Sequence, residues 1–217
     1  MTVRKAYGTL SSPATIRVLA SLQEYEFEYE FATGDMKAGE HKKEPFISLS
    51  PFGEVPVFQD GDLTLFDAWT MMRFISHCAV KPEKEMVFMD PKKQGIVAVW
   101  IDVADHQFEP PASKLRKELV EKPMNGLASD EDAVAEEEVK LAKVLDVYEE
   151  RLTESKYLGA EIFTVADLSH LPYLYCLMGT PAKRLFETRP HVSAWCADIM
   201  SRPAWTQVVD MMEKSQV

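Results

Sequence analysis

The 217-residue chain has no apolar run that approaches the roughly 18 residues of a membrane-spanning helix, so no span is expected. It also lacks an excess of positive charge, since 24 Lys and Arg stand against 35 Asp and Glu and the net charge is −11. A chain this acidic is a poor partner for nucleic acid or an anionic membrane. No signal-peptide pattern precedes the first strand-like segment, which favours the cytosol.

Cysteine is scarce as well. Cys78, Cys176 and Cys196 are odd in number and widely spaced, and none belongs to a C-x-x-C pair. This excludes a thioredoxin-type dithiol and predicts reduced, buried thiols in a cytosolic protein.

Hydrophobic residues make up 46% of the chain, enough for a core, and the first 80 residues alternate between strand-like and helix-like patterns. Strands are expected at 4–7, 27–31, 55–58 and 63–66, helices at 13–24 and 67–78, and a short helical or turn segment at 40–47. Asp60-Gly61 is a hairpin turn signal between the last two strands. The order βαβ–ββα predicts an α/β domain with a mixed four-stranded sheet and helices on both faces.

Residues 79–91 are polar and bracketed by prolines, which is typical of a linker. Beyond them, apolar residues recur at helical spacing, and Pro110-Pro111 should kink or end the first helix. We therefore predict domains at 1–80 and 92–217, the second all-helical, joined by a linker at 81–91. The three expected buried stripes are Ile96, Val99, Trp100 and Val103; Leu141, Leu145, Tyr148 and Leu152; and Val192, Trp195, Cys196 and Ile199.

Two local motifs indicate specific backbone structures. Thr164 and Asp167 have the spacing of a capping box, with Phe163 and Leu168 as its hydrophobic staple, which indicates a structural helix start. Pro56 should stand at a strand entry, and a cis Val55–Pro56 bond would turn the Val55 backbone groups toward an extended peptide.

Taken together, residues 8–19, EHKKEPF (40–46), SPFGEVPVFQDGDLTLF (50–66) and FTVADLSHLPY (163–173) resemble the phi-class glutathione transferases of plants. The resemblance covers nearly the whole chain. It implies a thioredoxin-like glutathione-binding domain followed by a helical domain, glutathione as co-substrate, no other cofactor and no metal. It also implies a cytosolic homodimer in which Phe52, on an exposed loop, fills a pocket of the second subunit.

The resemblance assigns the glutathione residues as well. Ser12 is the serine that stabilises the thiolate, with Ser11 in reserve, although the residues alone indicate simple N-capping before Pro13. A thiol titrates near pH 8.5, so the site must lower its pKa by about two units. The binding residues are His41 and Lys42 for the glycine carboxylate, Glu54, Val55 and Pro56 for the cysteine backbone, and Asp67 and Ala68 for the γ-glutamyl end.

The γ-glutamyl end departs from the family pattern. Where the family has Glu-Ser-Arg-Ala-Ile, this chain has Asp67-Ala68-Trp69-Thr70-Met71. Ala68 lacks the hydroxyl that would bind the α-carboxylate, and such a charge-assisted bond contributes about 1.5–3 kcal/mol. We therefore expect roughly ten- to hundred-fold weaker glutathione binding.

The electrophile pocket is expected between the domains, although each of its residues is also a candidate for ordinary core. They are Leu10, Met36, His106, Phe108 and Leu115.

The first functional hypothesis is conjugation of glutathione to hydrophobic electrophiles, in detoxification or secondary metabolism, with peroxide reduction as a possible side activity. A ligandin-type carrier of flavonoids, hormones or other planar apolar ligands is the alternative, favoured by Ala68. The third is a specialised biosynthetic catalyst.

Overall fold

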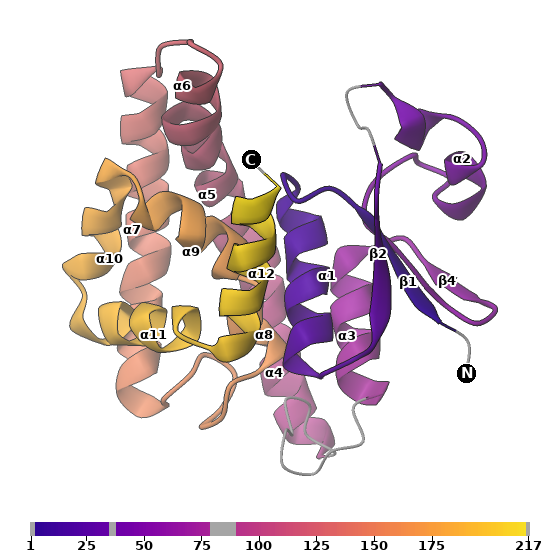
Figure 1. Ribbon diagram of the computed structural model, residues 1–217. Coiled ribbons are helices and arrows are strands. Elements are labelled where there is room, and N and C mark those ends of the chain that lie inside the picture. The colour runs from indigo at the N-terminus through magenta and orange to yellow at the C-terminus, as the bar shows by residue number, and fades with distance from the viewer. Residues whose placement is uncertain (1–2, 35–37, 79–89, 216–217) are drawn as a thin grey trace. The chain divides into compact units, whose positions relative to one another are not determined.

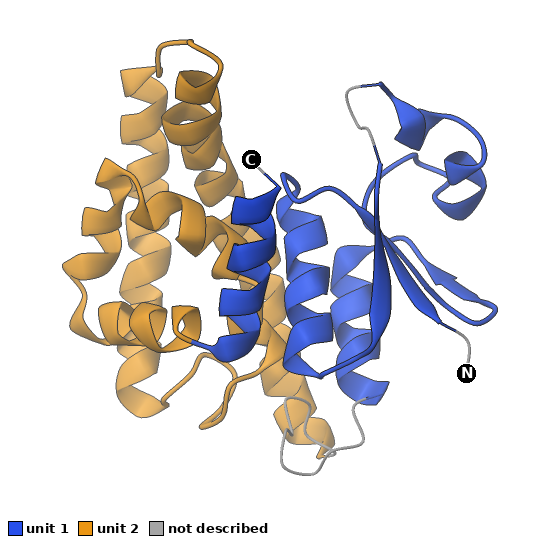
Figure 2. Cartoon of the chain, viewed as in Figure 1, with its two compact units in different colours: residues 1–84, 202–217 blue, residues 85–201 orange. Residues whose placement is uncertain are grey.

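The computed structural model describes residues 3–34, 38–78 and 90–215 (Figure 1). Contacts divide the chain into two compact units, residues 1–84 with 202–217 and residues 85–201 (Figure 2). The sequence prediction placed 202–217 in the helical domain, but these residues group with the first unit because α12 packs along α1. The predicted linker lies mostly outside the described residues.

The first unit is the predicted α/β domain, with four strands in the order β2-β1-β3-β4. β1 pairs parallel to β2 and antiparallel to β3, and β3 pairs antiparallel to β4. Figure 1 shows α1 and α3 on one side of the sheet and α2 on the other. The elements are β1 (Arg4–Gly8), α1 (Pro13–Glu24), β2 (Tyr29–Thr33), the 3₁₀ helix η1 (Glu40–Lys42), α2 (Phe46–Leu49), β3 (Val57–Asp60), β4 (Leu63–Leu65), α3 (Ala68–Cys78) and α12 (Pro203–Lys214).

Several boundaries in this unit differ from the prediction by one or two residues, among them that of β3, which begins at Val57 instead of Val55, and two of the differences have a clear local cause. The second strand begins two residues late, because the Phe27 N–H bonds to the Leu22 carbonyl and Glu26 adopts φ +56°, so this stretch closes α1. In the hairpin, Asp60 pairs with Leu63, which makes Gly61, with φ +64°, the first residue of the turn instead of the second.

Gly8 allows α1 to start close to the sheet. A Cβ at this position would lie 2.5 Å from side-chain atoms of Thr15, in the first turn of α1. Val18, Leu19 and Leu22 then bury one face of the helix completely, as predicted. The close approach fixes the short loop between β1 and α1, which carries Ser12.

The second unit is entirely helical over its described residues. None of the described helices is long and apolar enough to cross a membrane. The elements are α4 (Pro91–Val103), the π-helical segment η3 (Ala104–Phe108), α5 (Glu109–Arg116), a second π-helical segment η4 (Lys117–Glu121), α6 (Lys122–Met124), α7 (Glu131–Glu154), α8 (Val165–Leu168), α9 (Leu171–Met178), η5 (Pro181–Lys183), α10 (Arg184–Glu187) and α11 (Pro190–Met200).

The predicted apolar stripes of α7 and α11 are buried, but the prediction of which face of α4 is buried was wrong. Ile96 and Val99 are 47% and 58% exposed, while Val97 and Ile101 are buried. All six residues of 96–101 are apolar, so hydropathy alone does not distinguish the two faces.

Pro110 and Pro111 do not end the helical run, which continues through them as α5, so of the two predicted outcomes only the kink stays a prediction. A π-helical segment precedes them, and the two prolines stand in the first turn of α5. Proline has no N–H to donate into the helix, and the hydrogen bonding changes from α- to π-helical just before the two prolines, where the Glu109 N–H bonds to the Ala104 carbonyl.

The capping box at α8 is confirmed, and it is the centre of a buried polar cluster. The Asp167 carboxylate accepts bonds from the N–H groups of Leu158 and Thr164, the Thr164 hydroxyl and the Trp195 indole N–H, at 2.9 to 3.0 Å. This carboxylate ties three segments of the second unit together.

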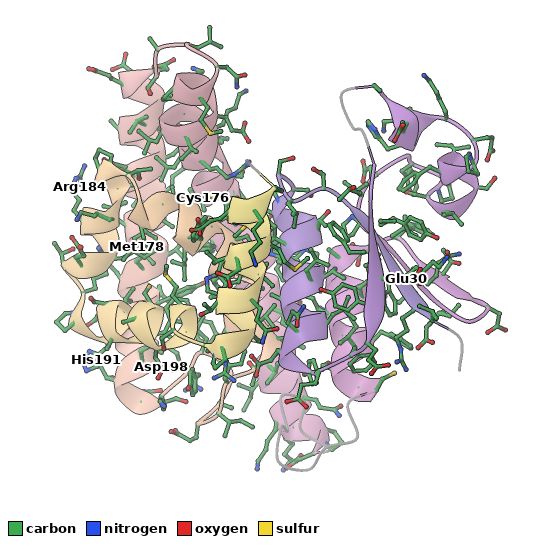
Figure 3. All side chains as sticks on the ribbon, viewed as in Figure 1. Glu30, Cys176, Met178, Arg184, His191 and Asp198 are labelled. Carbon is green, nitrogen blue, oxygen red and sulfur yellow. The ribbon has the colours of Figure 1, made fainter. Side chains whose placement is uncertain are left out.

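Two surface positions of α11, His191 and Asp198, are labelled in Figure 3. The Tyr157 hydroxyl donates to Asp198 Oδ2 at 2.7 Å, and Glu149 of α7 accepts from the Val192 N–H at 2.9 Å. These contacts attach α11 to its neighbours at both ends.

Candidate active site

The sheet brings four chain segments to one edge. Gly8 pairs with Thr33, Tyr7 with Val57 and Phe58 with Leu65. The ends of β1, β2 and β4 and the start of β3 therefore lie at the same edge. The predicted glutathione residues all lie in the segments that leave or enter these four strand ends: Ser12 after β1, His41 and Lys42 in η1 after β2, Glu54, Val55 and Pro56 before β3, and Asp67 and Ala68 after β4.

Ser12 is the N-cap of α1. Its Oγ accepts from the Thr15 N–H at 3.3 Å, and its own N–H donates to the Thr9 carbonyl at 3.1 Å. The side chain is half-buried, and the structure records no acceptor for its O–H among the described residues. The capping prediction is confirmed, and a capping hydroxyl still has its proton to donate.

The neighbouring Ser11 is exposed, and its hydroxyl lies 3.0 Å from the Thr9 hydroxyl. It does not cap the helix. Of the two serines, only Ser12 therefore has its hydroxyl at the N-terminus of α1.

Lys42 and Gly53 hold the η1 segment against the loop before β3. The Lys42 ammonium donates to the Phe52 carbonyl at 2.9 Å. A Cβ at Gly53, which has φ +58°, would lie 2.7 Å from the His41 carbonyl oxygen. His41 Nδ1 is shielded from solvent and has no hydrogen-bond partner in the described part of the chain.

The Val55–Pro56 peptide bond is cis, as expected from the sequence. Pro56 is buried, and β3 begins at the next residue, which confirms the position at a strand entry. The Glu54 N–H donates to Ser50 Oγ at 3.0 Å, and this bond fixes the loop that leads into the strand.

Asp67 caps α3 by accepting from the Thr70 N–H at 2.7 Å. Ala68, the first residue of the helix, is 7% exposed. Trp69 follows it, and its ring lies over the guanidinium of Arg17 in α1. The departure from the family motif thus coincides with a contact between α1 and α3 that sequence reasoning missed.

The residues expected to line the electrophile pocket differ in environment. Leu10 is half-buried and His106 is exposed, whereas Met36 lies outside the described residues. Phe108 and Leu115 are completely buried, and the Phe108 ring packs 4.5 Å from the ring of His170. A buried side chain offers no surface to a ligand, so the structure gives these two a packing role.

The loop before β3 carries an exposed aromatic pair. Phe52 is 71% exposed, and the centroids of its ring and the Phe66 ring are 6.3 Å apart. Large exposed apolar side chains in a cluster are typical of interaction surfaces.

The cysteines are free thiols, but only Cys196 is buried; Cys78 is exposed, which corrects the expectation of three buried thiols. Burial raises the pKa of the Cys176 thiol, so it is not an activated nucleophile. In the described ranges, no three His, Cys, Asp or Glu side chains gather as metal ligands.

Two family models match the chain. The glutathione S-transferase N-terminal domain matches residues 2–77, and the C-terminal domain of the same family matches residues 67–203.

Among curated proteins, a glutathione S-transferase of Hyoscyamus muticus is 52% identical over 95% of this chain and 97% of its own length. Glutathione S-transferase F7 of Arabidopsis thaliana is 48% identical over 94% of this chain and 98% of its own.

Among solved structures, glutathione transferase F7 of Populus trichocarpa has a TM-score of 0.91 and 37% identity, over 97% of this chain and 99% of that one. Glutathione S-transferase I of maize, solved in complex with an atrazine–glutathione conjugate, has a TM-score of 0.91 and 32% identity over 98% and 99%. The fold, the two domain matches and the plant relatives agree, and the chain therefore belongs to the glutathione S-transferase family of enzymes, in its plant phi class.

Proposed function

We propose that the enzyme conjugates the thiol of glutathione to hydrophobic electrophiles and that the Ser12 hydroxyl stabilises the thiolate. The observation that carries the proposal is the environment of Ser12. Its oxygen is engaged with the Thr15 N–H, so its O–H can donate to a sulfur anion at the start of α1. The helix dipole favours negative charge at the same place.

In this proposal the thiol releases its proton to water, and the sulfur then forms the new bond to the electrophilic carbon. The bond from that carbon to its leaving group breaks, and with chlorodinitrobenzene chloride departs with the electron pair. A hydroxyl donor and a helix N-terminus that together lower the thiol pKa by about two units supply about 3 kcal/mol. No covalent enzyme intermediate is required. The maize relative, solved with an atrazine–glutathione conjugate, supports an electrophile of this kind.

The tripeptide would lie along the sheet edge. Val55 would pair its backbone groups with the cysteine residue, and Asp67 would receive the γ-glutamyl ammonium. His41 and Lys42 would face the glycine carboxylate, although the Lys42 ammonium is engaged with the Phe52 carbonyl in this structure.

The test is the pH dependence of conjugation to chlorodinitrobenzene. Ser12→Ala should lower kcat/KM about a hundredfold near pH 7 and move the rising limb of the profile up by about two pH units. Ser12→Thr keeps both the hydroxyl and the cap and should retain most of the rate. Ser12→Gly removes the hydroxyl but weakens the cap by only about a few tenths of a kcal/mol, so a loss as large as that of Ser12→Ala separates thiolate stabilisation from capping. Ser11→Ala is the matched control. An unchanged pH profile in Ser12→Ala would contradict the assignment.

We also propose that the protein is a cytosolic homodimer with Phe52 as a contact between subunits. The exposure of Phe52 beside Phe66 supports this. Sedimentation of Phe52→Ala should show dissociation at concentrations where the natural protein is dimeric. Exposed Val139 of α7 gives the control, Val139→Ala.

Ala68 favours the ligandin alternative, because it leaves only backbone N–H groups for the α-carboxylate of glutathione. Calorimetric titration decides between the two. Measurable glutathione binding together with conjugation supports the transferase. Absence of both, with retained binding of a planar apolar ligand, would make the carrier role the correct one.

A further inference from the structure

A cavity of about 360 Å³ opens in the first unit beside the proposed glycine end of the site. Its walls come from both the sheet and the segment around η1 and α2, and they include Tyr7, Ala32, His41, Lys43 and Phe46. The volume falls within the range of small-molecule pockets, roughly 300–1,000 Å³. Glutathione ends in glycine, whose carboxylate is separated from the amide nitrogen by a single methylene.

The lining carries His41 and Lys43, which can bind a carboxylate, together with two acidic residues, Glu40 and Glu44. His41 Nδ1 is shielded from solvent without a hydrogen-bond partner among the described residues, and a shielded polar atom of this kind needs a partner. Lys43 lines the cavity, and its ammonium makes one long contact, 3.4 Å to the Ala38 carbonyl. Of the two glutamates in the lining, Glu44 accepts from the Ser48 hydroxyl at 2.6 Å.

The two adjacent lysines, Lys42 and Lys43, differ in what their side chains contact. Lys42 donates to the Phe52 carbonyl at 2.9 Å and does not line the cavity, whereas Lys43 does. His41 and Lys43 line the same cavity, so a carboxylate held in it has both side chains in its surroundings.

We propose that this cavity accepts tripeptide thiols whose C-terminal residue is longer than glycine, and that Lys43 binds their terminal carboxylate. The inference rests on the proposed function, because it places the glycine end of glutathione at His41. The substrate class is a γ-glutamylcysteinyl peptide with an extended C-terminal acid, for which γ-glutamylcysteinyl-β-alanine is the simplest probe. Lys43 acts here as a specificity residue and takes no part in the chemical step.

The experiment measures kcat and KM for glutathione and for γ-glutamylcysteinyl-β-alanine with one electrophile. The natural protein should use the longer thiol at least as well as glutathione. Lys43→Gln should lower the preference for the longer thiol about tenfold, through KM, because a charge-assisted bond is lost. Lys143→Gln, an exposed lysine of α7, is the control and should leave the preference unchanged.

Ala32→Leu provides a second readout by partly filling the cavity, and it should lower the same preference. Retained conjugation of glutathione shows that this variant folds. A natural protein that uses glutathione but discriminates tenfold or more against the longer thiol would overturn the inference, as would a preference that neither variant changes. If neither thiol is conjugated, the proposed function fails first.

Discussion

The guanidinium carbon of Arg17 lies 4.6 Å from the centroid of the Trp69 ring. Arg17 belongs to α1 and is 2% exposed, and Trp69 belongs to the first turn of α3. A cation over an aromatic face is stabilised by the ring quadrupole, and the effect grows when water is excluded. One of the residues that depart from the family motif, Trp69, thus joins the two helices whose N-termini carry Ser12 and Asp67.

Replacing Trp69 with leucine should destabilise the first unit by about 2 kcal/mol, because the buried Arg17 loses its aromatic partner. Urea unfolding followed by circular dichroism measures the change. Trp69→Phe keeps a ring and should recover at least half of the loss. Equal stability of the leucine and phenylalanine variants would show that the ring face makes no contribution.

Asp167→Ala should cost about 3 kcal/mol or more, because it leaves four buried donors without their acceptor. Thr164→Ala removes only the cap hydroxyl and should cost about 1 kcal/mol. Denaturant midpoints of the two variants give the comparison. If the alanine at 167 costs no more than the alanine at 164, the carboxylate is not the centre of the cluster.

The hydrogen bonds that the Glu149 carboxylate accepts from the start of α11 should make a pH-dependent contribution to the free energy of unfolding. Burial by itself raises the pKa of its carboxyl, but hydrogen bonds from Val192 and His191 outweigh burial, so the pKa lies below its usual value. The contribution is therefore complete above the unfolded-state pKa, about 4.3, and is lost as the pH falls through the lower folded-state pKa.

Glu149→Gln should accordingly reduce the free energy of unfolding by about 1 kcal/mol at pH 7, as expected for a group that caps a helix. The difference from the natural protein should shrink when unfolding is repeated near pH 3. Glu150→Gln, at an exposed neighbouring position, is the control. A difference that stays constant across this range would mean that charge is not involved.

Ala68→Ser restores the hydroxyl of the family motif at the first position of α3. Glutathione should bind about tenfold more tightly in calorimetry, since one charge-assisted hydrogen bond is regained. Ala133→Ser places a hydroxyl near the N-terminus of α7, in the other unit, and should have no effect on binding. Unchanged affinity in Ala68→Ser would indicate that the present site already satisfies the α-carboxylate.

Local patterns predicted much of the fold. α1 was predicted with its observed bounds because Ser12 and Pro13 define its start and its apolar face is continuous. The capping box at Thr164 was predicted from four residues. The buried face of α4 was not, because Ile96, Val97 and Val99 are equally apolar and only the packing distinguishes them.

The sequence by itself determined the order of the elements, the family, and the set of residues expected to bind glutathione, because each depends on short motifs and helical or strand periodicity. The tertiary structure decided what no motif contains. The sheet register brought four distant segments to one edge, α12 joined the first unit, and Arg17 met Trp69. It also gave the adjacent residues Lys42 and Lys43 different environments, since the Lys42 ammonium donates to the Phe52 carbonyl and Lys43 lines a cavity. All of these features depend on contacts between residues far apart in the chain, which local motifs do not contain.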